Sequence, residues 1–154
     1  MTTLCDRPAI AGRLSSKVKI HRMPAVLRSS LEKASADAKH FFWSKTSEKD
    51  RAAFFARGKL GDDGTGAVYA YFDEVGNALY VGEAGRPIKR RMHDQTSPHK
   101  EKLWWETWKT VRFLQVRDRT DRLTLELLLI LALKPEFNSK PGARTFATMF
   151  ENEA

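Results

Sequence analysis

Two short runs rich in aromatic and β-branched residues, AVYAYFD and NALYVG, flank the turn-forming sequence EVGN near the middle of the chain. Such runs on either side of a short turn predict two β-strands joined as a hairpin. A strand pair with apolar side chains on both faces must be covered by other elements on both sides. The hairpin therefore restricts the fold more than any other feature of the sequence.

The segment before the hairpin is expected to be mainly helical. Residues 24–43 begin with a proline, which suits a first helical turn, and carry apolar residues at helical spacing. These residues are Leu27, Leu31, Ala34, Ala38 and Phe41. A break is expected near residues 44–47. A second short helix would then end before Gly58, with Phe54 and Phe55 on its buried side.

Two helical segments are predicted after the hairpin. Residues 86–95 should form a helix because Pro87 is well placed for its first turn. Residues 97–108 are also expected to be helical and to turn their tryptophans toward the packed face. The tryptophans of this segment are Trp104, Trp105 and Trp108.

A third strand and a last helix complete the expected fold. Residues 110–118 alternate apolar and polar side chains, which predicts a strand. Residues 120–134 predict a helix that Thr120 or Asp121 opens and Pro135 ends. The order of elements predicts an α+β fold, in which a small antiparallel three-stranded sheet is flanked by helices and preceded by a basic helical extension.

The length of 154 residues suits one compact domain with an appendage. The sequence GKLGDDGTG, rich in glycine and aspartate, is the expected boundary between segments. We therefore divide the chain into a basic, mostly helical extension (1–60), a central domain (61–142) and a loosely ordered tail (143–154). The extension is expected either to contact DNA or to serve in oligomerisation.

The positive charge of the chain is concentrated in that extension. Residues 1–60 contain 13 Lys and Arg against 5 Asp and Glu, a balance of +8, whereas residues 61–154 contain 14 of each. A basic segment joined to a neutral domain favours a polyanionic partner, and nucleic acid is the first candidate because phosphate contacts release counterions. Ordinary solubility charge is the plainer interpretation.

Cysteine content and hydropathy argue against several classes of protein. The single cysteine, Cys5, can form neither a disulfide framework nor a thiolate metal cluster. The N-terminal sequence lacks the apolar run of a secretory signal, and the longest apolar run is far too short to span a membrane. We therefore expect a cytoplasmic protein without membrane contact.

A purely structural role explains Glu126 less well than any other residue of the chain. It lies among leucines and an isoleucine on a helix that is apolar almost all round. Burying an unpaired carboxylate there would cost several kcal/mol or force the group to protonate. Glu126 should therefore face solvent, a cationic partner or a metal ion.

Together, these features resemble the GIY-YIG nuclease family over about residues 66–142. The family's two tyrosine motifs correspond to Ala67-Val68-Tyr69 and Tyr80-Val81-Gly82. Its arginine corresponds to Arg90, ten residues after the second tyrosine. Its helical glutamate corresponds to Glu126, and its closing element to Pro135-Glu136-Phe137-Asn138. The first motif lacks its glycine, although Gly66 lies one place earlier.

The resemblance implies a phosphodiester hydrolase with one divalent ion held by Glu126. Mg²⁺ is the expected ion, and Mn²⁺ should substitute for it. Arg90 would stabilise the transition state, while Tyr69 and Tyr80 would position the attacking water, with Tyr69 favoured as proton acceptor. The family often has a histidine shortly after the arginine; His93 is the first candidate here and His99 a weaker one.

The remaining site residues are expected to contact or frame the substrate. Gly82 would allow close approach of the substrate, and Asn138 would orient Glu126, cap the site or simply end the helix. The predicted phosphate contacts are Arg86, Lys89 and Arg91 near the hairpin and Arg13, Lys17, Lys19 and Arg22 in the extension.

The resemblance therefore leads us to expect a DNA endonuclease, with RNA and a homodimer left open. A restriction-like, phage or mobile-element role is favoured. The alternatives are an RNA-directed or toxin-type nuclease of the same family, a nucleic-acid-binding module without catalysis, and a structural protein that docks through its tryptophans. A metal-dependent cleavage assay would separate these alternatives.

Overall fold

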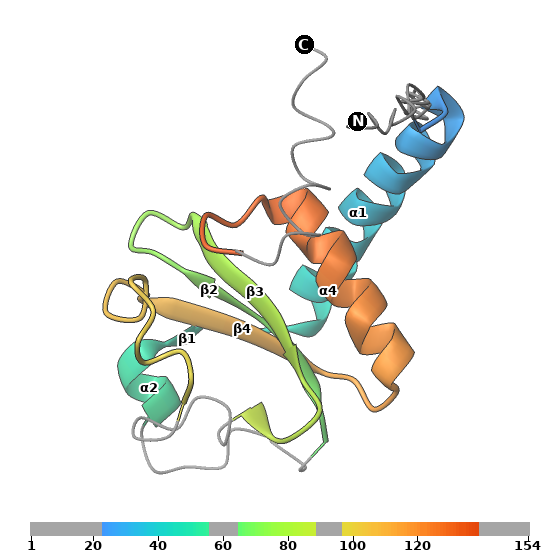
Figure 1. The fold of residues 1–154 in the computed structure, drawn as a ribbon. Helices are drawn as coiled ribbons and strands as arrows, with labels where there is room; N and C mark the ends of the chain where they lie inside the picture. Colours follow the sequence, from blue (N-terminus) through green and yellow to red (C-terminus); the bar gives the residue numbers. More distant parts are fainter. Residues whose placement is uncertain (1–22, 56–64, 89–96, 139–154) are drawn as a thin grey trace, which may run out of the picture.

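A computed structural model describes residues 23–55, 65–88 and 97–138 of the chain (Figure 1). Within them, strands β2 (Ala67–Phe72) and β3 (Ala78–Ala84) form the expected antiparallel hairpin. The turn is fixed by the Asp73 carboxylate, which accepts hydrogen bonds from the backbone N–H of Val75 and of Asn77. The positive φ of Gly76 (87°) suits a glycine in this turn.

Two more strands extend the sheet beyond β2, as Figure 1 shows. Strand β4 (Thr110–Gln115) pairs with β2, and the two-residue strand β1 (Lys49–Asp50) pairs with β4, giving the order β1-β4-β2-β3. The predicted α+β class is confirmed, with four strands in place of three. The additional strand escaped prediction because two residues are too few to produce a hydropathy pattern.

Strand β1 also shortens the helix predicted over residues 47–57. The helix, α2 (Arg51–Phe55), starts only after the strand, and the Asp50 carboxylate accepts a hydrogen bond from the backbone N–H of Ala53. Of the two phenylalanines expected inside, Phe54 is buried, whereas Phe55 is 41% exposed.

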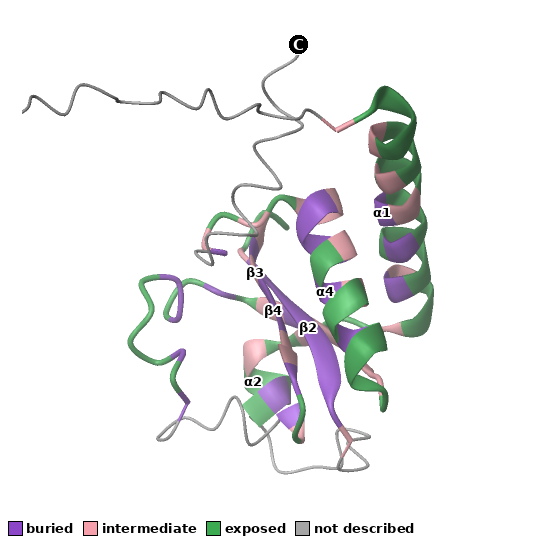
Figure 2. Ribbon diagram, turned by 45° about the vertical axis from the view of Figure 1, so that its right-hand side comes forward, coloured by how far each residue is buried: buried purple, intermediate pink, exposed green. Residues whose placement is uncertain are grey.

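Helices α1 (Ala25–Lys45) and α4 (Arg119–Leu133) cover one face of the sheet. Figure 2 shows β2 buried, β3 and β4 partly buried, and helices whose outer sides are exposed. The core on this face is formed by the residues Phe42, Val68, Ala70, Phe72, Val81, Leu129 and Ile130.

The predicted inner face of α1 is wrong in part. Ala38 is buried as expected, but Leu27 and Phe41 are 54% and 47% exposed, while the neighbouring Phe42 is fully buried. Phe42 belongs to the core against the sheet, so α1 is rotated from the predicted orientation by about one residue. The apolar stripe read from the sequence therefore lies at the border of the contact between the helices.

The opposite face of the sheet is covered by α2 and by residues 97–108. This segment is not the predicted helix: it is a series of turns, with hydrogen bonds from the N–H of Lys102 to the carbonyl of His99 and from Trp105 to Lys102. Its three tryptophans are nonetheless buried, as predicted. Packing of these large side chains on the sheet overrides the local helical preference.

The N-cap of helix α4 lies two residues before Thr120 and three before Asp121, the two predicted caps. Asp118 is the N-cap, and its carboxylate accepts a hydrogen bond from the backbone N–H of Asp121. Lys134 ends the helix in the left-handed conformation, directly before Pro135. No helix in residues 23–55, 65–88 and 97–138 is long and apolar enough to cross a membrane.

Residues 25–55 pack with the sheet and contribute buried side chains to both of its faces, Phe42 to one and Phe54 to the other. The predicted division of the chain into three segments stays a prediction. The helix expected over residues 86–95 and the tail after residue 142 lie largely or wholly outside the described residues.

The orientation of α1 can be tested with two neighbouring substitutions. Phe42→Ala should lower the free energy of unfolding by about 3–5 kcal/mol, because it opens a cavity against the sheet. Phe41→Ala should lower it by less than about 1 kcal/mol, because that ring is half exposed. Urea unfolding measures both, and equal losses would contradict the orientation described here.

Candidate active site

The two motif tyrosines lie on neighbouring strands, on the face that carries the tryptophans. Their ring centroids are 6.4 Å apart. Gly82 lies directly opposite Tyr69 in the strand pairing. A Cβ atom at Gly82 would lie 2.7 Å from the Tyr69 hydroxyl and 2.7 Å from Cε1 of Tyr80. The glycine therefore makes room for the tyrosine rings, whereas the sequence suggested room for substrate.

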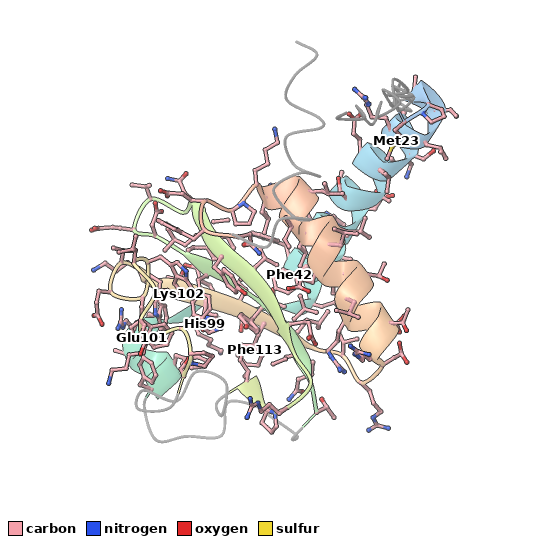
Figure 3. All side chains as sticks on the ribbon, in the orientation of Figure 1. Met23, Phe42, His99, Glu101, Lys102 and Phe113 are labelled. Atoms are coloured by element: carbon pink, nitrogen blue, oxygen red, sulfur yellow. The ribbon has the colours of Figure 1, made fainter. Side chains whose placement is uncertain are left out.

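His99 joins this pair from the segment of turns. Its Nε2 lies 3.1 Å from the Tyr69 hydroxyl, and which of the two atoms donates depends on the histidine tautomer. The ring is buried, with the ring of Tyr80 at 5.2 Å and that of Trp104 at 5.4 Å. Figure 3 shows His99 on the segment that covers the sheet on the side away from Phe42. The weaker of the two histidine candidates thus contacts a motif tyrosine.

The two tyrosines differ in their access to solvent. Tyr69 is fully buried, whereas Tyr80 is only partly buried. Tyr80 stacks on Trp104, with ring centroids 5.1 Å apart and an interplanar angle of 13°. This contact fixes the plane of the more accessible tyrosine.

Glu126 lies on α4, on the side of the sheet opposite to the tyrosine rings. It is 7% exposed, so it does not project into solvent, one of the three environments expected from the sequence. The neighbouring Leu129 and Ile130 are part of the core. The helix thus holds a carboxylate at the border of an apolar core.

One turn before Glu126 on the same helix, Arg122 forms a buried ion pair. Its Nε donates to the Glu83 carboxylate at 3.1 Å, and its Nη1 donates to the carbonyls of Val116 and Arg117 at 2.9 and 2.7 Å. Neither Arg122 nor Glu83 is among the residues predicted from the sequence. The spacing of four residues between Arg122 and Glu126 was the available signal, because it places both charges on one face of the helix.

Asn138 binds the outer edge of β3. Its side-chain oxygen accepts a hydrogen bond from the N–H of Val81 at 2.9 Å, and its side-chain nitrogen donates to the Val81 carbonyl at 2.7 Å. Two backbone N–H groups, from Glu136 and Phe137, donate to carbonyls earlier in the strand. The segment after α4 is therefore hydrogen-bonded to β3 as far as Val81, and Asn138 positions this segment on the strand.

Several predicted site residues lie outside the described part of the chain: Lys89, Arg90, Arg91, His93, Arg13, Lys17, Lys19 and Arg22. Their roles stay predictions. Arg86 is described and exposed, two residues after the end of β3.

The described residues suit a metal ion that keeps most of its water ligands better than one enclosed by protein ligands. Among the described residues, no three His, Cys, Asp or Glu side chains are grouped as they would be in a protein cage for a metal ion. A single carboxylate is a sufficient protein ligand for Mg²⁺, which usually keeps several waters and takes substrate phosphate oxygens. Glu126 fits such a site.

Residues 65–139 match the sequence profile of the UvrC-like GIY-YIG domain. The chain contains a GIY-YIG nuclease domain. A curated relative, the UvrABC system protein C of Nautilia profundicola, is 35% identical over 82 residues, which cover 46% of this chain and 13% of that protein. The chain thus spans a small fraction of the length of this relative. No solved structure matches the chain. The resemblance inferred from the motifs is confirmed, and the GIY-YIG domain belongs to a family of nucleases.

The geometry predicts that Gly82→Ala damages the GIY-YIG domain locally. The new methyl group would collide with both tyrosine rings and should lower the free energy of unfolding by about 1–3 kcal/mol. The near-ultraviolet circular dichroism of the stacked aromatic rings should change with it. An alanine variant with wild-type stability and spectrum would contradict the close packing at this position.

Proposed function

We propose that the protein is a divalent-metal-dependent endonuclease that hydrolyses DNA phosphodiester bonds. The observation that carries the proposal is the arrangement of the GIY-YIG residues around β3. Tyr80 and the hydrogen-bonded Tyr69 and His99 lie on one face of the sheet, and the buried Glu126 lies on the helix that packs on the other. Strand β3 lies between them at the edge of the sheet.

Tyr80 is the better candidate for the proton acceptor. A group that removes a proton from water must reach that water, and Tyr80 is partly exposed whereas Tyr69 is fully buried. This assignment replaces the preference for Tyr69 drawn from the sequence. A tyrosine has a reference pKa of about 10, so nearby positive charge must favour its phenolate form at neutral pH.

Tyr69 and His99 act behind Tyr80 in this scheme. The hydrogen bond between them, together with the contacts of both rings with Tyr80, holds the proton-accepting tyrosine in a fixed orientation. Trp104 supports the same ring from its stacked position. Such fixed geometry is required for general base catalysis.

Glu126 would hold the divalent ion, Mg²⁺ or Mn²⁺. When bound, such an ion polarises the phosphoryl oxygens and stabilises the departing 3′-oxygen. The protein's own part is to keep the carboxylate at the border of the core, where α4 fixes its position. Arg90 is proposed to stabilise the negative charge of the transition state.

The basic N-terminal region is proposed to bind the nucleic acid. Residues 1–22 contain five Lys and Arg and one Asp, a balance of +4, which is half of the net charge of +8 of the chain. Such a segment attracts phosphates over a long range and makes binding dependent on salt. DNA is the proposed substrate, with RNA tested alongside it, and a restriction-like, phage or mobile-element role remains the proposed setting.

Glu126→Gln tests the metal ligand. The substitution preserves the size of the side chain but removes its charge, so cleavage of plasmid DNA in Mg²⁺ should fall by roughly two orders of magnitude or more. Glu74→Gln, at an exposed position in the hairpin turn, is the matched control and should cleave like the wild type. Near-normal cleavage by a folded Glu126→Gln protein would refute the assignment, and chelator should abolish cleavage by the wild type.

Three tyrosine variants test the division of roles. Tyr80→Phe should slow single-turnover cleavage by roughly two to four orders of magnitude, because the proton acceptor is lost. Tyr69→Phe should be impaired less, because it loses the bond to His99 but keeps the proton acceptor. Tyr71→Phe, buried on the same face but outside the motif, is the control. The assignment to Tyr80 fails if Tyr69→Phe is the slower of the first two.

A further inference from the structure

The guanidinium of Arg122 lies in a slot between two glycines at the end of the hairpin. A Cβ atom at Gly66, just before β2, would lie 2.8 Å from its Cζ and Nη1 atoms. A Cβ atom at Gly85, just after β3, would lie 3.3 Å from Nη2. The side chain is 8% exposed. The absence of side chains at both glycines is therefore what admits the guanidinium to this position.

Only part of this guanidinium is used for holding the fold together. Nε binds Glu83, and Nη1 binds the two carbonyls at the end of β4. Within the described part of the chain, Nη2 donates no hydrogen bond, yet it is not one of the fully buried polar atoms without a partner. Nη2 therefore reaches the surface, beside the exposed Gly85.

We propose that Nη2 of Arg122 is a further phosphate-binding group, which takes a non-bridging oxygen of the nucleic-acid backbone. The inference rests on the proposed function and adds a residue to the same site. Arg122 lies one helical turn from Glu126, and residues at this spacing have side chains about 6 Å apart at their bases. A guanidinium with two free N–H groups matches a phosphate better than any other side chain does.

The Glu83 carboxylate orients the guanidinium of Arg122. It accepts from Nε in direct contact, while Glu126 lies on the next turn of the helix. Because Glu83 holds the guanidinium in place, binding a phosphate at Nη2 would require no rearrangement of the side chain.

Two variants separate phosphate binding from the structural ion pair. Glu83→Gln removes the ion pair and keeps the guanidinium. Glu83→Gln combined with Arg122→Gln removes both charges and keeps two amides that can bond to each other. The affinity of each full-length protein for a short DNA duplex is measured in chelator, over a range of salt concentrations. Thermal unfolding shows whether each variant is folded.

The double variant should lose one phosphate contact relative to Glu83→Gln. Its plot of log affinity against log salt should be shallower by about 0.9, and its affinity should be roughly tenfold weaker at moderate salt. A purely structural role for Arg122 would leave the slopes of the two variants equal, and equal slopes overturn the inference.

If the double variant does not fold, Gly85→Ala tests the inference in its place. Its methyl group would lie 3.3 Å from Nη2 without touching the ion pair, and it should weaken DNA binding several-fold. Wild-type affinity in Gly85→Ala would then overturn the inference. Because these measurements read binding alone, a wild-type protein that binds as expected but cleaves nothing in Mg²⁺ or Mn²⁺ overturns only the proposed function.

Discussion

The pairing of Tyr69 with Gly82 across the hairpin is the contact on which the arrangement of the site depends. Directly opposite positions in an antiparallel pair have Cβ atoms only about 5 Å apart, so a glycine at one of them leaves room for the ring at the other. With glycine at one position, the ring of Tyr69 lies over the neighbouring strand and approaches Tyr80. The same ring then reaches His99 on the segment that covers the sheet. One missing side chain thus brings three functional groups together.

The two faces of the sheet contribute different chemistry because different elements cover them. Turns rich in tryptophan cover the tyrosine face and hold His99 and Tyr80 by ring contacts. Helix α4 covers the other face and carries Arg122 and Glu126, one turn apart. Strand β3 separates the two sets. The segment that follows α4 pairs with its outer edge only as far as Val81, where Asn138 is bound.

Elements with a strong local pattern could be predicted from the sequence, and elements defined by tertiary contacts could not. The hairpin has β-forming runs on either side of a turn sequence, and the last helix is a long apolar run between capping residues and a proline. The motif spacing selected Tyr69, Tyr80 and Glu126 as candidate site residues. The turns of residues 97–108 look helical in sequence because burial of their tryptophans, and no local preference, decides their path. The rotation of α1 and the contact of His99 with Tyr69 depend in the same way on packing between distant segments.

The unpredicted ion pair explains how a helix this apolar can carry charged residues at the sheet. Arg122 would be costly to bury alone, but Glu83 and two carbonyls satisfy three of its N–H groups. If all the N–H groups of Arg122 were hydrogen-bonded within the protein, the side chain would only stabilise the fold. Because Arg122 keeps Nη2 at the surface one turn from Glu126, the proposed phosphate contact and the stability of α4 depend on the same side chain. Substitutions at Glu83 should therefore affect the fold and the site together, and only the removal of the guanidinium itself should remove a phosphate contact.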